Sequence, residues 1–196
     1  MDNKLKIVNY LGKNVGQCFT MHRLSKLINI PYASFYRTVQ NMGDILEVLV
    51  VGKSKTVCLK TTNPVVKAHL TVSSDEEKKE FLQKQPIIKK IAAELSINDK
   101  LSINDIVVLF GSYAKGKETE KSDIDLLIIN KDGKKSLSFS KYEVLFKKKI
   151  NPIFVTVKEF KQMLQDKEEN VGKQALKTHI ILNNPESFWR LVFNGI

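Results

Sequence analysis

Apolar positions recur every three or four residues in the first third of the chain and are then grouped into strand-like runs. This spacing predicts a helix over residues 3–12, a second helix that begins after Thr20 as its N-cap, and a third helix over 32–42. Two apolar runs, 45–51 and 56–60, flank a Gly-Lys-Ser-Lys tetrapeptide, which predicts a β-hairpin with a basic tip. The chain therefore begins with three short helices and one hairpin.

The second half of the chain shows apolar runs of strand length that alternate with helical patterns. Strands are expected over 107–110, 123–129, 152–157 and 177–182, and helices over 138–149, 158–167 and 185–192. Alternating strands and helices predict an α/β domain.

Between the two halves, Ser74 and Glu77 form the pattern of a capping box that opens a helix at Asp75, and Pro86 begins another helix. The expected organisation is an N-terminal domain over 1–72, a helical connector over 73–100 and the α/β domain over 101–196.

Helix, turn, helix and hairpin in this order resemble a winged helix-turn-helix domain. One face of the third helix and the hairpin tip carry groups that suit base edges and phosphates; the candidate DNA-binding residues are Ser34, Arg37, Gln40, Asn41, Lys53 and Lys55. Residues 1–72 carry ten lysines and arginines against three acids, so ten minus three, or seven, of the eleven net positive charges lie in this part of the chain. The resemblance implies double-stranded DNA as partner. The alternatives are a solvated polar face or a protein-docking module.

Composition excludes several classes of protein. A hydrophobic content of 42% is ordinary for a folded domain, and no apolar run approaches the ~18 residues that a membrane span needs. The N-terminus lacks the apolar core of a signal peptide. Cys18 and Cys58 are far apart and lack metal-ligand spacing, so neither a disulfide nor a zinc site is expected. A cytoplasmic protein without membrane contact is the expectation.

The most informative segment joins the first two strands of the α/β domain. Gly111 and Ser112 follow an apolar run, and Asp123 and Asp125 open the next one. Residues two apart on a strand point to the same face, so the two carboxylates project side by side. Such a pair suits a divalent hard cation, while a Gly-Ser turn offers donors for a phosphate. The pattern predicts nucleotidyl or phosphoryl transfer.

This pattern resembles the signature of the DNA polymerase beta-like nucleotidyltransferases, and most closely the small minimal type. The resemblance implies an α/β domain with a mixed sheet, two Mg²⁺ ions on Asp123 and Asp125, and a nucleoside triphosphate, with ATP as the expected one. Gly111 and Ser112 would hold the triphosphate, Lys115 would reach its phosphates, and Ser122 would orient Asp123. AMP would pass to a hydroxyl on a protein, an RNA or a small molecule.

The resemblance fails at one position, because active members carry a third acid on the next core strand. Residues 151–157 contain no Asp or Glu, and Glu143 and Glu159 lie outside this strand. Three hypotheses follow: a transferase coupled to a DNA-binding domain, a catalytically silent DNA-binding regulator, and an antitoxin-type adenylyltransferase that acts on a partner toxin. The sequence leaves the choice among them open, and also whether the chain forms a homodimer.

Overall fold

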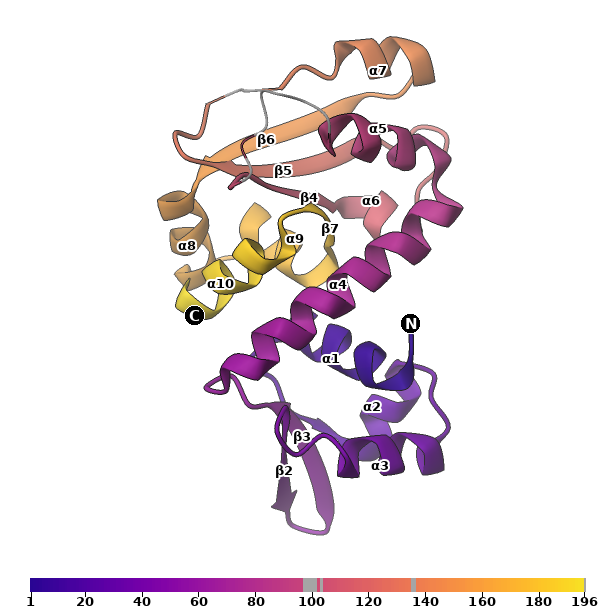
Figure 1. Cartoon of the computed structure of the whole chain (residues 1–196), viewed down its shortest axis with the longest axis vertical. Helices are drawn as coiled ribbons and strands as arrows, with labels where there is room; N and C mark the ends of the chain where they lie inside the picture. The colour runs from indigo at the N-terminus through magenta and orange to yellow at the C-terminus, as the bar shows by residue number, and fades with distance from the viewer. Residues whose placement is uncertain (97–101, 103, 135–136, 196) are drawn as a thin grey trace. The chain divides into compact units, whose positions relative to one another are not determined.

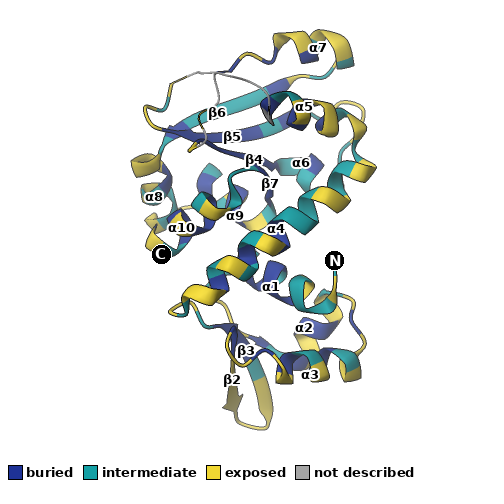
Figure 2. Ribbon diagram, in the orientation of Figure 1, coloured by how far each residue is buried: buried dark blue, intermediate teal, exposed yellow. Residues whose placement is uncertain are grey.

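A computed structural model describes residues 1–96, 102, 104–134 and 137–195 of the protein (Figure 1). The chain divides into two compact units, Met1–Glu76 and Glu77–Ile196. Each unit has its own sheet and its own buried core (Figure 2). Within the described residues, no helix combines the length and the apolar character that crossing a bilayer requires.

The first unit contains three helices packed on a small sheet. Its elements are α1 (Asn3–Lys13), β1 (Phe19–Thr20), α2 (Met21–Leu27), α3 (Tyr32–Gln40), β2 (Leu46–Val51), β3 (Ser54–Leu59) and the beginning of α4 (Pro64–Lys84). The strands pair antiparallel in the order β1-β3-β2. Thr20 caps α2 as expected, because its hydroxyl accepts a hydrogen bond from the Arg23 backbone N–H at 3.3 Å.

The hairpin of β2 and β3 is tighter than the sequence predicts. The strands pair from Leu46 opposite Leu59 to Val51 opposite Ser54, so the turn consists of Gly52 and Lys53 alone. Gly52 has a φ of 60°, a conformation that two-residue hairpin turns need and that glycine adopts readily.

Cys18 and Cys58 form a disulfide bond, so the expectation that these cysteines stay separate is wrong. They are 40 positions apart in the sequence. However, β1 pairs with β3 so that Phe19 lies opposite Val57, and the same register brings the two cysteines together. Their Cα atoms are 4.6 Å apart, a distance that suits a disulfide. Because β1 has only two residues, no periodic pattern in the sequence announces this pairing.

Helix α4 contradicts the capping box expected at Ser74. It is one helix of 21 residues that begins at Pro64. Ser73 and Ser74 are buried in its middle, where both hydroxyls donate to the Leu70 carbonyl at 2.9 Å. A serine that bonds a carbonyl of the preceding turn is tolerated inside a helix, so the residue type alone gave a false start signal.

The second unit has a mixed sheet of four strands. Its elements after α4 are α5 (Pro86–Ser96), β4 (Ile106–Phe110), α6 (Gly111–Ala114), β5 (Ile124–Asn130), α7 (Ser140–Phe146), β6 (Ile150–Thr156), α8 (Val157–Gln165), α9 (Val171–Thr178), β7 (Ile180–Asn183) and α10 (Pro185–Gly195). The order is β6-β5-β4-β7; β6 runs parallel to β5, and the other pairs are antiparallel. This confirms the expected α/β domain with a mixed sheet.

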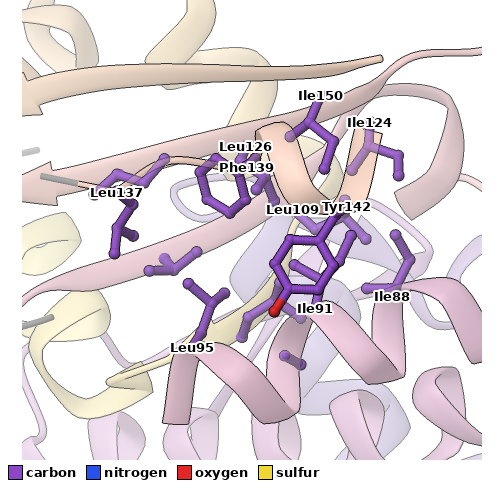
Figure 3. Packing of buried hydrophobic residues seen from close by; sticks show 14 of the residues in the cluster. Ile88, Ile91, Leu95, Leu109, Ile124, Leu126, Leu137, Phe139, Tyr142 and Ile150 are labelled. Atoms are coloured by element: carbon purple, nitrogen blue, oxygen red, sulfur yellow. The ribbon is translucent and has the colours of Figure 1, made fainter. Parts of the chain in front are cut away.

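One part of the core of this unit lies between the sheet and α5, while α8 and α10 bury further large side chains, Phe160 and Trp189 among them. Ile88, Ile91 and Leu95 of α5 form one buried cluster with strand residues such as Leu109 and Leu126 (Figure 3). Burying each large apolar side chain contributes roughly 1.5–3 kcal/mol. The helix that the sequence assigned to a connector therefore helps to hold the central strands in place.

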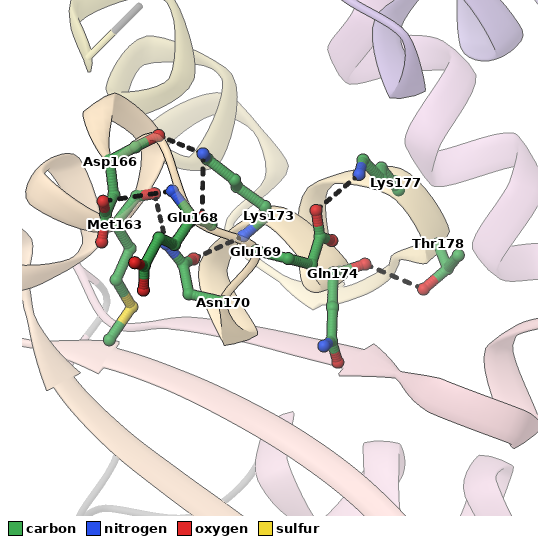
Figure 4. A network of polar contacts seen from close by, with 9 residues as sticks. All are labelled: Met163, Asp166, Glu168, Glu169, Asn170, Lys173, Gln174, Lys177 and Thr178. Atoms are coloured by element: carbon green, nitrogen blue, oxygen red, sulfur yellow. Dashed lines mark hydrogen bonds and ion pairs between the residues drawn. The ribbon is translucent and has the colours of Figure 1, made fainter.

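The segment between α8 and α9 is fixed by polar contacts (Figure 4). Asn170 caps α9, because its Oδ1 accepts from the Lys173 backbone N–H at 3.1 Å and its Nδ2 donates to the Met163 carbonyl at 2.8 Å. The sequence prediction missed α9 and placed a strand from Lys177. That prediction is wrong at its start, since the helix capped by Asn170 continues to Thr178.

Candidate active site

Two carboxylates lie where the central strands meet a tight turn. Asp123 directly precedes β5 and Asp125 is its second residue, so both side chains project to one face. Both residues are half-buried. Asp125 stands opposite Phe110, the last residue of β4, and this register brings the turn at Gly111 beside the carboxylate pair. The strand register thus joins the two halves of the sequence motif.

Gly111 approaches Asp125 so closely that no side chain fits between them. Its φ is 74°, in the left-handed region that favours glycine. A Cβ added here would lie 2.3 Å from Asp125 Oδ2 and 3.2 Å from its Cγ. The backbone of Gly111 therefore forms one wall of the carboxylate site.

The other motif residues lie near this wall. Ser112 is half-buried in the short helix α6, and Lys115 is exposed at its end. The role of Ser122 in orienting Asp123 stays a prediction. The Oγ of Ser122 accepts a hydrogen bond from the Thr119 backbone N–H at 2.8 Å, so its hydroxyl closes the turn that precedes the carboxylates.

Asn151 completes the site from the neighbouring strand. β6 pairs parallel with β5, and Asn151 stands opposite Asp125. Its Nδ2 donates to Asp123 Oδ2 at 3.1 Å and to Asp125 Oδ1 at 3.3 Å. Sequence reasoning noted that this strand lacks an acid but did not identify Asn151. The signal that could have found it is the polar residue at the start of an apolar strand, and only the register shows that it faces the carboxylates.

The acids before and after β6 are engaged elsewhere. Glu143 Oε1 accepts from the Ile150 backbone N–H at 2.9 Å. Glu159 Oε2 accepts from the Thr156 backbone N–H at 2.7 Å and from its hydroxyl at 2.8 Å, and these bonds, the backbone one first, lower the pKa of Glu159. Both carboxylates serve the two ends of the strand.

One lysine lies beside the carboxylate pair. Lys149 Nζ is 3.8 Å from Asp123 Oδ2, and its side chain is 68% exposed. A solvated ion pair of this kind contributes at most about 1 kcal/mol. Its main effect is to reduce the repulsion between the two carboxylates.

The donor set of the site fits a hard divalent cation. Among the residues that the structure describes, no three His, Cys, Asp or Glu side chains group together to hold a metal ion. The site offers instead the carboxylates of Asp123 and Asp125 with the amide of Asn151, beside the closely approaching backbone of Gly111. Oxygen ligands from one or two carboxylates, completed by substrate phosphates, are what Mg²⁺ usually takes.

The DNA-binding candidates of the first unit fall into two groups. Arg37, Gln40 and Asn41 are exposed on or just after α3, and Lys53 and Lys55 are exposed on the hairpin. Ser34 is half-buried, and its hydroxyl accepts a hydrogen bond from the Asn3 side chain of α1 at 3.0 Å.

A pocket of about 370 Å³ lies where α2 and α3 face the hairpin turn. Its lining includes His22, Tyr32, Tyr36, Lys53 and Lys55. The ring centroids of His22 and Tyr32 are 5.8 Å apart, and those of Tyr32 and Tyr36 are 6.3 Å apart. Lys55 Nζ lies 5.3 Å from the Tyr36 ring centroid and 3.4 Å from its hydroxyl. Sequence reasoning named the lysines but missed the aromatic rings.

Comparison with known proteins concerns mainly the second unit. The family described as "Nucleotidyltransferase domain" matches residues 88–191, which is more than half of the chain. Two proteins of Methanocaldococcus jannaschii, each named "Putative protein adenylyltransferase", are also similar to this chain. The first is 37% identical over 98 residues, covering 45% of this chain and 95% of that protein. The second is 44% identical over 66 residues, covering 34% of this chain and 56% of that protein. No solved structure matches the chain.

Proposed function

Since the chain belongs to the nucleotidyltransferase domain family, we propose that its second unit transfers AMP from ATP to a hydroxyl group of a protein. The observation that carries the proposal is the pair Asp123 and Asp125, held by β5 against the backbone of Gly111. The names of the two related proteins support a protein as the acceptor. A toxin paired with this chain is one acceptor of that kind.

Each group of the site has a separate task in this proposal. Asp123 and Asp125 hold Mg²⁺, while the Gly111 backbone, Ser112 and Lys115 bind the triphosphate. When bound, Mg²⁺ would neutralise negative charge on the triphosphate and on the leaving pyrophosphate.

The transfer exchanges one phosphorus–oxygen bond for another. The acceptor oxygen attacks the α-phosphorus, the bond from that phosphorus to the oxygen that bridges to the β-phosphate breaks, and pyrophosphate leaves. Because the amide of Asn151 is not a base, the hydroxyl proton passes to one of the two carboxylates or to water.

Titration calorimetry of the full chain with Mg²⁺ and ATP tests nucleotide binding. The double substitution Asp123→Asn/Asp125→Asn is expected to weaken binding at least tenfold, because it removes both carboxylates. Asp132→Asn is the matched control, since Asp132 is exposed in the turn after β5 and should leave binding unchanged. Binding that is absent, or equal in the double variant, contradicts the proposal.

A silent regulator is the second candidate function, and the amide at Asn151 favours it. In that case the site binds nucleotide as a signal and transfers nothing. ATP labelled at the α-phosphate separates the two functions, because only a transferase moves this label to an acceptor protein. ATP labelled at the γ-phosphate is the control, since adenylyl transfer leaves that label in pyrophosphate.

For the first unit, we propose that it binds double-stranded DNA as a winged helix domain. Support comes from the exposed residues of α3, the basic hairpin tip and the ten lysines and arginines among residues 1–72. The pocket beside Tyr36 adds the ammonium groups of Lys53 and Lys55, which suit phosphates of the DNA backbone.

Fluorescence anisotropy with duplex DNA at several salt concentrations tests this second proposal. Arg37→Ala and Lys53→Ala should each weaken binding, and the loss of a phosphate contact should reduce the salt slope by about 1. Lys6→Ala removes the same charge from an exposed position of α1 and is the control. If neither substitution differs from the control, the unit is a docking module, and the exposed apolar residues of β2, Val50 and Val51 among them, are its contact surface.

A further inference from the structure

The amide of Asn151 has a defined orientation between the two carboxylates. Ionised carboxylates only accept hydrogen bonds, so only the NH₂ end of an amide can face both of them. The distances of 3.1 Å to Asp123 and 3.3 Å to Asp125 agree with this orientation. Asn151 therefore bridges two like charges that would otherwise repel each other.

The backbone gives Asn151 little freedom to leave this position. It pairs with Asp125 in the parallel ladder of β5 and β6, and its neighbour Ile150 is buried in the core. Pro152 follows it and restricts residue 151 to an extended conformation. Because β6 is an edge strand, the missing N–H of this proline is tolerated.

We infer that Asn151 is itself a ligand of the divalent cation and binds it through its side-chain oxygen. The inference rests on the proposed function, because it concerns the Mg²⁺ that Asp123 and Asp125 would hold. In the cation-free protein the NH₂ group faces the carboxylates. Rotation of the amide about its terminal bond brings Oδ1 to the same side, and amide oxygens are common ligands of hard cations.

This ligand set predicts the order in which the cation and the nucleotide arrive. Two carboxylates and an amide carry two negative charges, whereas a third acid would raise the number to three. The lower charge, further offset by Lys149 at 3.8 Å from Asp123, weakens the attraction for a free cation. The site is therefore expected to take Mg²⁺ together with the triphosphate and to hold it weakly in the absence of nucleotide.

Titration of the full chain with Mn²⁺ in the absence of nucleotide tests the inference. The electron paramagnetic resonance signal of free Mn²⁺ measures how much of the cation is bound. Asn151→Asp should bind Mn²⁺ at least tenfold more tightly than the native protein, because it adds a third carboxylate. Asn151→Ala should bind it several-fold more weakly, because it removes one oxygen ligand. Asn104→Asp is the control, because it adds the same charge at an exposed position just before the first residue of β4. It should change the Mn²⁺ affinity little.

Two results would overturn the inference. If Asn151→Ala binds Mn²⁺ as tightly as the native protein or more tightly, the amide only competes with the cation for the carboxylates. If Asn151→Asp gains no more than Asn104→Asp, residue 151 does not face the cation. Thermal unfolding of each variant shows whether it is folded. The side-chain NH₂ signals of Asn151 in the native protein should shift when the cation-free protein is saturated with diamagnetic Mg²⁺.

The same variants separate this inference from the proposed activity. Changed Mn²⁺ affinity without transfer of the α-label from ATP supports the ligand role and rejects the transferase. Transfer of the label with unchanged Mn²⁺ affinity in both Asn151 variants rejects the ligand role alone.

Discussion

Two glycines near the site show how differently single residues are constrained. Gly111 and Gly116 both have a positive φ, of 74° and 62°. A Cβ at Gly111 would meet Asp125 Oδ2 at 2.3 Å, whereas nothing lies within 4 Å of a Cβ at Gly116. Alanine substitutions at these two glycines can therefore distinguish the free-energy cost of a strained backbone from the cost of displacing the Asp125 carboxylate.

Gly116→Ala is expected to lower the free energy of unfolding by about 1–2 kcal/mol, because an L-residue is forced into the left-handed region. Gly111→Ala meets the same strain and also pushes Asp125 away. It should therefore lower the affinity for Mg²⁺–ATP at least tenfold, while Gly116→Ala leaves it unchanged. Urea unfolding and titration calorimetry provide the two measurements. Equal ATP affinities in both variants would show that the close approach at Gly111 has no consequence for the site.

At the scale of elements, β6 depends on groups at both of its ends. Its first residue, Ile150, donates its backbone N–H to Glu143. At its last residue, Thr156 and Glu159 form a capping box in which each side chain bonds the backbone of the other. The box fixes the point at which the strand ends and α8 begins, and so supports the strand that carries Asn151.

The capping box predicts a pH-dependent contribution to stability. Hydrogen bonds from Thr156 lower the pKa of Glu159 below its ordinary value of 4.5. A lowered pKa means that the ionised acid stabilises the fold above about pH 4.5, and that this contribution is lost as the pH falls further. Glu159→Gln should therefore destabilise the protein at pH 7 and converge with the native protein in acid. Thr156→Ala should cost about 1 kcal/mol at pH 7.

Urea unfolding of Glu159→Gln and the native protein across the range from pH 7 to 3 measures this difference. A difference in unfolding free energy that stays constant over this range would contradict the role assigned to Glu159.

At the scale of the whole molecule, each of the two compact units carries a feature that allows its unfolding to be followed separately. The first unit is closed by the Cys18–Cys58 disulfide, which spans 40 positions. The second unit contains the single tryptophan of the chain, Trp189, fully buried in α10. Fluorescence of Trp189 therefore reports on the second unit alone, while circular dichroism reports on both.

Cys18→Ser/Cys58→Ser is expected to destabilise the first unit by up to about 4 kcal/mol, from the loop entropy of a cross-link of this length. Guanidinium unfolding followed by circular dichroism should show an earlier transition for the first unit. The Trp189 transition should keep its midpoint, because the disulfide lies outside the second unit. An equal shift of both transitions would mean that the units unfold together.

Much of the fold follows from local patterns in the sequence. Pro86 with Ile88, Ile91 and Leu95 predicts α5 because a helix that packs on a sheet needs one apolar face. Errors occur where a local signal has two meanings. Ser74 suits a helix start but lies inside α4, and the residues after Asn170 form a helix that short-range pattern did not show.

The nucleotidyltransferase identity was visible in the sequence, because Gly111, Asp123 and Asp125 belong to one motif whose spacing reflects two adjacent strands. The partners of these residues were not visible. Asn151 meets the carboxylates, and Cys18 meets Cys58, through strand pairings between segments distant in the chain. Local periodicity states which residues form a strand and which face they share. Register between strands depends on the packing of the whole sheet, and it alone determined which side chains meet.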